Sequence, residues 1–194
     1  KISSKPPDEA HKHASKKHLK ELHKELFELQ NVFYADGRFG LLIILQGMDA
    51  SGKDGICRHV MSAMNPMGVN VMAFKKPTEQ EKEHDFLWRI YPHFPPKRMI
   101  QVFNRSYYED ILVPSVEGTY SQEIIEHRYK LIDAVEHHLN INNIHVLKFF
   151  LHISREEQAE RIAERKTIPH KKWKYDNADE ISDAKWRKYR QTYE

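Results

Sequence analysis

The order of apolar and polar positions along the chain predicts strands that alternate with helices. An unbroken apolar run at 41–45 ends at a glycine-rich turn, which is typical of a strand buried on both faces. Further strands are predicted at 70–74, 99–103 and 145–151, and helices near 53–64, 79–91 and 122–140. This alternation indicates βαβ units around a parallel central sheet.

Helical signals also occur outside these units. Apolar residues recur at spacings of three and four through 10–35, which predicts an amphipathic N-terminal helix. The histidines in its first half have no accompanying pattern of carboxylates or cysteines, so a solvated surface is a better interpretation than a metal site. Capping-box spacing at Thr78 with Glu81, and at Ser154 with Glu157, marks two further helix starts.

Length and composition fit a single folded domain, 1–194. The 194 residues are 40% hydrophobic, and no apolar run reaches the roughly 18 residues of a membrane span. Basic residues outnumber acidic ones by only 31 to 28, so the local lysine and arginine clusters, more than the net charge, indicate a polyanionic ligand. The single cysteine, Cys57, excludes an internal disulfide and suits the cytoplasm, which is the expected compartment.

The strongest motif is the segment GMDASGKD at 47–54, which has the GxxxxGK pattern of a phosphate-binding loop. It lies between the strand at 41–45 and a predicted helix, as such a loop requires. Backbone amides can approach phosphate oxygens there, and the Lys53 ammonium can neutralise charge on the transferred group. The predicted phosphate-binding residues of the loop are Gly47, Ala50, Ser51, Gly52, Lys53 and Asp54. The alternative is an ordinary glycine-rich turn with a surface lysine.

The acidic residues of this loop bear on the cofactor. Asp54 stands where the usual motif places a Ser or Thr hydroxyl on magnesium, so the metal shell must differ. Asp49 supplies a carboxylate that can hold Mg²⁺ directly or through water, because this cation prefers oxygen ligands. Mg²⁺ is therefore the expected cofactor and Asp49 its ligand. Alternatively, Asp49 only stabilises the loop through backbone hydrogen bonds.

A second polar cluster, NRSYYED at 104–110, follows the strand predicted at 99–103. The carboxyl ends of the strands are where open α/β sheets bind ligands. Arg105 can bind phosphate oxygens through its fork of donors, and Glu109 can orient metal-bound water or a nucleotide hydroxyl. A structural ion pair between the two residues is an equal alternative.

These motifs occur in a recognisable order. GMDASGKDG, FKKPT at 74–78, HDFLWRIYPHFPPK at 84–97 and FNRSYYEDIL at 103–112 together resemble the polyphosphate kinase 2 family. The resemblance extends through RIAERK at 161–166 and KKWKYDNADE at 171–180, which look like that family's lid and the segment after it. It covers most of the chain.

The resemblance implies a fold and an activity. The fold would be a three-layer α/β/α P-loop kinase fold, thymidylate-kinase-like, with a parallel central sheet and a helical lid. The activity would be Mg²⁺-dependent, reversible phosphoryl transfer between inorganic polyphosphate and adenine nucleotides, with guanine nucleotides left open. Glu109 resembles class III members, which phosphorylate both AMP and ADP, whereas class I favours ADP and class II favours AMP.

The family's functional positions can be carried over one by one. Asp49, Lys53, Asn104 and Arg105 match the loop and strand-end motifs, while Arg58 and Lys75 match phosphate-channel positions. Arg161 and Arg165 match the lid, expected at about 161–175, where a spacing of four places them on one helix face. Pro169 should interrupt the helical pattern in this segment, because proline disfavours helical geometry in the residue before it, and a further helix is expected from Asp179. Of these residues, Asp49, Lys53, Arg105 and Arg165 are the predicted catalytic set. For the two lid arginines, ion pairs with Glu157 or other helix partners are the alternative.

Direct in-line transfer fits these residues better than a phosphohistidine intermediate, because no histidine has an evident activating partner. The rival functions are an ATP-dependent nucleoside monophosphate kinase and a noncatalytic polyanion-binding module. Nucleic acid and membrane partners are not expected, and a homo-oligomer is expected from the resemblance alone.

Family members continue for several tens of residues beyond the position of Glu194. Either the C-terminal part of the fold is missing from this sequence, or the protein is short for its family.

Overall fold

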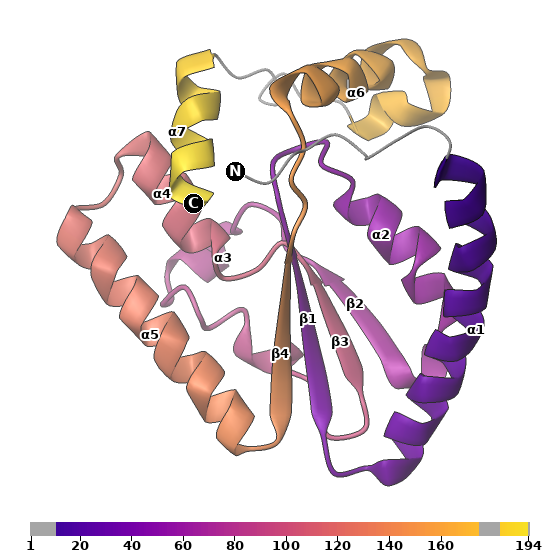
Figure 1. Cartoon of the computed structure of the whole chain (residues 1–194). Helices are drawn as coiled ribbons and strands as arrows, with labels where there is room; N and C mark the ends of the chain where they lie inside the picture. The colour runs from indigo at the N-terminus through magenta and orange to yellow at the C-terminus, as the bar shows by residue number, and fades with distance from the viewer. Residues whose placement is uncertain (1–10, 175–182, 194) are drawn as a thin grey trace.

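The computed structural model of the chain describes residues 11–174 and 183–193, which form an α/β fold around a parallel sheet (Figure 1). The sheet has four strands in the order β2-β3-β1-β4. The strands are β1 (Gly40–Gln46), β2 (Val69–Ala73), β3 (Ile100–Asn104) and β4 (Ile144–Phe150). Each lies within one residue of its predicted position. The central strands β1 and β3 are mostly buried, whereas the edge strands β2 and β4 are largely exposed.

Helices cover both faces of the sheet, which gives three layers (Figure 1). The α-helices are α1 (His11–Asp36), α2 (Lys53–His59), α3 (Glu79–Lys82), α4 (Glu109–Glu117), α5 (Gln122–Ile141), α6 (Arg155–Thr167) and α7 (Asp183–Tyr193). Leu42 and Ile44 of β1 pack with α4, α5 and the 86–94 segment, whereas Ile43 and Leu45 face α1 and α2. Alternate residues of β1 therefore enter two separate hydrophobic cores.

Two predicted helices are shorter than expected. The helix predicted at 79–91 ends at Lys82, and a 3-10 turn at Tyr91–His93 follows after irregular backbone. The Asp85 side chain accepts a hydrogen bond from the Leu87 backbone N–H at 3.0 Å, which favours a turn over a continued helix. Likewise, the helix predicted at 53–64 ends at His59 and continues only as a 3-10 turn at Met61–Ala63.

Helix α4 was not predicted, and Pro114 lies inside it. A proline there lacks the N–H that would bond to the carbonyl of Asp110, four residues earlier. Arg128 of α5 donates a hydrogen bond from Nη1 to that carbonyl instead. A side chain distant in sequence therefore satisfies the group that proline leaves open.

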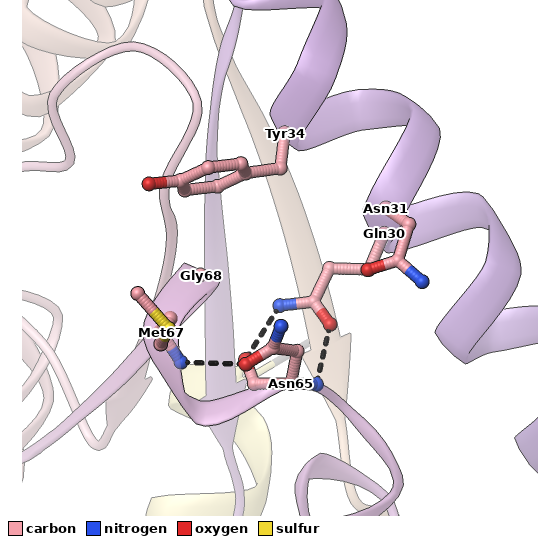
Figure 2. A pocket seen from close by; sticks show the side chains of 6 residues that line it. All are labelled: Gln30, Asn31, Tyr34, Asn65, Met67 and Gly68. Carbon is pink, nitrogen blue, oxygen red and sulfur yellow. Dashed lines mark hydrogen bonds between the residues drawn. The ribbon is translucent and has the colours of Figure 1, made fainter.

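A reciprocal pair of hydrogen bonds fixes α1 to the segment that precedes β2. The Gln30 side chain, only 3% exposed, donates to the Asn65 carbonyl at 2.9 Å and accepts from the Asn65 N–H at 2.6 Å. Figure 2 shows this pair in a small pocket of about 70 Å³, lined by Gln30, Asn31, Tyr34, Asn65, Met67 and Gly68. The polar groups of the pair satisfy one another, and their contact holds α1 against the segment that precedes β2.

The predicted lid region begins inside a regular helix. Arg161 and Arg165 lie on α6, which starts at its N-cap Ser154; Ile168 is extended, with φ −85° and ψ 117°. Pro169 thus ends the helix as predicted, and a 3-10 helix at Pro169–Lys174 follows. The last expected lid residue, Tyr175, and the helix start expected at Asp179 lie outside the described residues. The description resumes with α7, which begins at Asp183.

No helix within residues 11–174 and 183–193 has the length and apolar character needed to cross a membrane.

Candidate active site

The site lies at the carboxyl ends of β1 and β3, which are neighbours in the sheet. The segment after β1 leads into α2 on one face of the sheet, while the segment after β3 leads into α4 on the other. Adjacent strands whose connections diverge in this way leave a crevice between them, where open α/β sheets bind ligands. The topology therefore brings the phosphate loop and the NRSYYED cluster to one place.

The phosphate loop, residues 47–53, has an unusual backbone that its sequence permits. Ala50 and Gly52 both lie in the left-handed region, with φ of 61° and 107°. Glycine adopts this conformation without steric strain, whereas in a residue with a Cβ such as Ala50 it costs about 1 kcal/mol. A tight loop of this kind directs backbone amides towards a phosphate.

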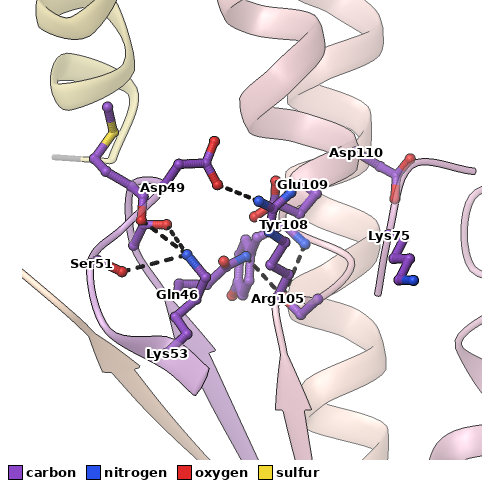
Figure 3. A network of polar contacts seen from close by, with 12 residues as sticks. Gln46, Asp49, Ser51, Lys53, Lys75, Arg105, Tyr108, Glu109 and Asp110 are labelled. Atoms are coloured by element: carbon purple, nitrogen blue, oxygen red, sulfur yellow. Dashed lines mark hydrogen bonds and ion pairs between the residues drawn. The ribbon is translucent and has the colours of Figure 1, made fainter. Parts of the chain in front are cut away.

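Lys53 lies at the start of α2 and bends back over the loop (Figure 3). Its ammonium donates to the carbonyls of Gly47 and Met48 at 2.6 and 3.0 Å and to Ser51 Oγ at 3.5 Å. The side chain is buried, and burial lowers the pKa of Lys53, an effect that the nearby Asp49 carboxylate partly opposes. A buried ammonium held by dipoles is well placed to receive the negative charge of a phosphate group.

The charges of the two motifs meet across the crevice (Figure 3). Arg105 Nη2 donates to Asp49 Oδ1, and its Nη1 lies 4.0 Å from Glu109 Oε2. Arg105 has φ of 65°, a strained backbone that places its guanidinium between the two carboxylates. The ion pair with Glu109 that the sequence left open is therefore present at the edge of contact distance, and the stronger partner is Asp49.

Asn104 and Asp54 form a second bridge between the motifs. Asn104 Nδ2 donates to Asp54 Oδ1 at 2.8 Å. The aspartate that replaces the usual Ser or Thr thus has a partner on β3. Both predicted residues lie at the crevice, joined by a bond that local spacing could not reveal.

Glu109 carries a carboxylate whose pKa is perturbed by its surroundings. Its side chain is 19% exposed, and burial raises the pKa of Glu109 although Arg105 and Lys53 act in the opposite direction. Next to it, burial likewise raises the pKa of Asp110, which pairs with Arg89 at 3.2 Å. Perturbed acids beside buried cations are typical of functional sites.

The remaining predicted residues surround this centre at different distances. Arg161 donates from Nη1 to the Ala50 and Ser51 carbonyls at 3.1 and 3.0 Å and pairs through Nε with Glu157 at 2.6 Å. Arg165 is half-buried in the last turn of α6.

Two cations lie away from the loop. Arg58 is exposed in the last turn of α2, at the opposite end from Lys53. Lys75 has an exposed side chain, which Figure 3 draws near Asp110 and apart from the contacts of Lys53. Its backbone carbonyl accepts from Arg89 Nη1 at 2.9 Å.

Sequence reasoning missed the residue that anchors the strand-end loop, Glu136 of α5. This nearly buried carboxylate accepts hydrogen bonds from the Tyr107 and Tyr108 hydroxyls at 2.9 and 2.8 Å and from Lys148 Nζ at 2.6 Å. Burial, together with the Glu136 charge, raises the pKa of Tyr108 to about 12. The only signal in the sequence was the pair of tyrosines inside NRSYYED.

The donor set suits magnesium better than a metal that needs a complete protein shell. Among the described residues, no three His, Cys, Asp or Glu side chains gather as a ready-made metal site. Mg²⁺ commonly takes one or two carboxylates and completes its shell with water and phosphate oxygens. Asp49, 41% exposed at the mouth of the loop, provides such a carboxylate.

A phosphate loop after the first buried strand, a cationic strand end beside it and a parallel sheet together define the P-loop kinase class. Residues 9–194 match the family model described as Polyphosphate kinase 2 (PPK2). The chain belongs to this family.

Individual relatives agree with this assignment. The chain is 42% identical over 186 residues to an AMP/ADP-polyphosphate phosphotransferase of Meiothermus ruber, covering 96% of this chain and 70% of the relative. An ADP-polyphosphate phosphotransferase of Rhodopseudomonas palustris is 40% identical, with 93% of this chain and 68% of the relative covered.

Among solved structures, polyphosphate kinase 2 from Arthrobacter aurescens TC1 superimposes with a TM-score of 0.86 at 42% identity. That comparison covers 90% of this chain and 63% of the Arthrobacter protein. The chain therefore spans about two thirds of the length of these relatives.

Proposed function

We propose that the protein catalyses reversible, Mg²⁺-dependent phosphoryl transfer between inorganic polyphosphate and the adenine nucleotides AMP and ADP. The observation that carries this proposal is the cluster of Lys53, Asp49, Arg105 and Glu109 where the carboxyl ends of β1 and β3 meet. Relatives named for polyphosphate phosphotransfer to AMP, to ADP or to both support the choice of substrates.

The proposed reaction is a direct in-line displacement. An oxygen of the acceptor's terminal phosphate attacks the terminal phosphorus of polyphosphate, the bridging P–O bond breaks, and the shortened chain leaves with the bond's electron pair. Such a transfer needs positioning and charge neutralisation rather than a protein nucleophile. Lys53 and the loop amides would hold the transferring group, and Arg105 would neutralise charge opposite them.

Magnesium would be held by Asp49 and would supply charge neutralisation on the phosphate oxygens. Arg105 at present binds the same carboxylate, so it would also set the orientation of Asp49. Asn104, through its bond to Asp54, would keep the two motifs in register.

The acceptor preference is proposed to be that of class III, with AMP and ADP both accepted. Glu109 supports this, because a strand-end motif with Glu rather than Asn at position 109 resembles class III members. The Meiothermus relative, whose name includes both acceptors, supports it as well.

Outside the centre, Lys75 and Arg58 are proposed to guide the polyphosphate chain, since both are exposed cations, Arg58 on the helix that begins at the phosphate loop and Lys75 just after β2. Arg161 and Arg165 are proposed to bind the transferring phosphates from α6.

A homo-oligomer is also proposed. Leu29 and Val32 on α1, 66% and 68% exposed, offer apolar surface for it.

One experiment separates this function from its rivals. Purified protein is incubated with Mg²⁺, ADP and polyphosphate in the absence of ATP, and ATP is measured by luminescence. The proposed function predicts ATP that appears only when polyphosphate is present. An ATP-dependent nucleoside monophosphate kinase would instead phosphorylate AMP with ATP and ignore polyphosphate, and a noncatalytic polyanion-binding module would bind polyphosphate without turnover.

A further inference from the structure

The carbonyl groups of the phosphate loop need hydrogen-bond donors, and the loop's own residues supply only some of them. When backbone amides of such a loop point inward to a phosphate, carbonyls of the same peptides point outward and need donors. The Lys53 ammonium donates hydrogen bonds to the Gly47 and Met48 carbonyls. The next three carbonyls, those of Asp49, Ala50 and Ser51, are served from α6.

Two side chains one turn apart on α6 supply those donors. Gln158 Nε2 donates to the Asp49 carbonyl at 2.9 Å, and Arg161 Nη1 donates to the Ala50 and Ser51 carbonyls at 3.1 and 3.0 Å. Gln158 is only 3% exposed, although glutamine is usually a surface residue. A Cβ added at Gly52 would lie 3.3 Å from Arg161 Nη1, so the loop and α6 are in close contact.

The start of α6 is itself held firmly. The Ser154 side chain accepts from the Glu157 N–H at 3.2 Å, but the Glu157 carboxylate does not close the expected capping box. It accepts from Arg161 Nε at 2.6 Å instead. Glu157 thus orients the guanidinium that binds the loop.

We propose that Gln158 is a positioning residue that holds the phosphate loop in its phosphate-binding conformation from the α6 side. Through Gln158 and Arg161, the loop is coupled to the helix that continues to Arg165 and the lid region. This proposal rests on the proposed phosphoryl-transfer function for its purpose. The contact itself belongs to the fold, and the loop conformation can be measured without any turnover.

The test compares two variants with a matched control. Gln158→Met keeps the length and packing of the side chain but removes the donor, and Gln158→Glu replaces the donor with an acceptor facing the Asp49 carbonyl. Glu160→Gln, an exposed position on the same helix, is the control. Hydrogen exchange of the peptide covering 47–53 reports the loop, and calorimetry with tripolyphosphate and Mg²⁺ reports phosphate binding.

Losing one hydrogen bond should raise exchange in the 47–53 peptide about tenfold in both Gln158 variants and weaken tripolyphosphate binding by a similar factor. Exchange in β1 and β3 should stay at the wild-type rate, and Glu160→Gln should match wild type in both assays. Wild-type exchange in Gln158→Met and Gln158→Glu would overturn the proposal, as would a uniform rise across β1 and α6. If wild-type protein binds no tripolyphosphate, the proposed function fails, while the exchange result still decides the role of Gln158.

Discussion

Replacing Glu136 with leucine should destabilise the protein, because it removes the acceptor shared by three donors. The Tyr107 hydroxyl is fully buried and would lose the bond of 2.9 Å that satisfies it. Tyr108 and Lys148 would lose bonds of 2.8 and 2.6 Å, but Lys148 is 47% exposed and can turn to water.

The expected cost follows from these exposures. An orphaned buried hydroxyl costs about 1–3 kcal/mol, and the two more accessible donors add about 1 kcal/mol together. We therefore expect Glu136→Leu to lower the free energy of unfolding by about 2–4 kcal/mol. For a chain of this size, that loss corresponds to a Tm about 4–16 °C lower.

Urea denaturation followed by tryptophan fluorescence measures this loss, with Asp133→Ala as the control at an exposed position of the same helix. Adding Tyr107→Phe to Glu136→Leu removes the orphaned hydroxyl, so the double variant should lose less stability than the two single losses summed. A loss below about 1 kcal/mol in Glu136→Leu, or strict additivity in the double variant, would refute the reasoning.

Four further predictions concern the site itself. Lys53→Ala and Asp49→Ala should each remove most activity with the fold retained; by steady-state kinetics, only the Asp49 defect should change with Mg²⁺ concentration. Arg165→Ala should lower kcat by about 10³-fold, and Arg165→Lys should recover little because an ammonium lacks the planar fork; a wild-type kcat would remove Arg165 from the mechanism. Lys75→Ala should raise the KM for long polyphosphate more than that for nucleotide, most strongly at low salt, and equal effects would argue against a channel there. Because burial raises the pKa of Glu109 above 4.5, its ionised form costs stability above that raised pKa; Glu109→Gln should raise Tm at neutral pH, with a gain that vanishes near pH 4.5, and a constant gain in thermal scans across pH would contradict this.

Features set by local sequence could be predicted. The strand at β1 follows from an apolar run buried on both faces, and the phosphate loop follows from glycines placed between that strand and a helix. The helix end at Pro169 follows from the restriction that proline imposes on Ile168. In each case, the cause lies within a few residues of the feature.

Features that depend on contacts distant in sequence could not be predicted. In α4, Arg128 donates to the Asp110 carbonyl that Pro114 leaves without its helical partner. The sequence around Pro114 gives no indication of that donor. The anchoring role of Glu136 depends on α5 facing the loop after β3. Arg161 was expected to reach phosphates, a role that stays a prediction, but its contacts with the loop carbonyls depend on how α6 crosses the loop.

The central claim is that polyphosphate is the phosphoryl donor and that the phosphate loop performs the transfer. The most direct measurement uses polyphosphate labelled with radioactive phosphorus and unlabelled ADP, in Mg²⁺ and without ATP. The account predicts label in the γ-phosphate of ATP, no label retained on the protein, and loss of most of the transfer in Lys53→Ala. Label that stays on the protein would contradict direct transfer, and absence of label from ATP with the wild-type protein would contradict the proposed function itself.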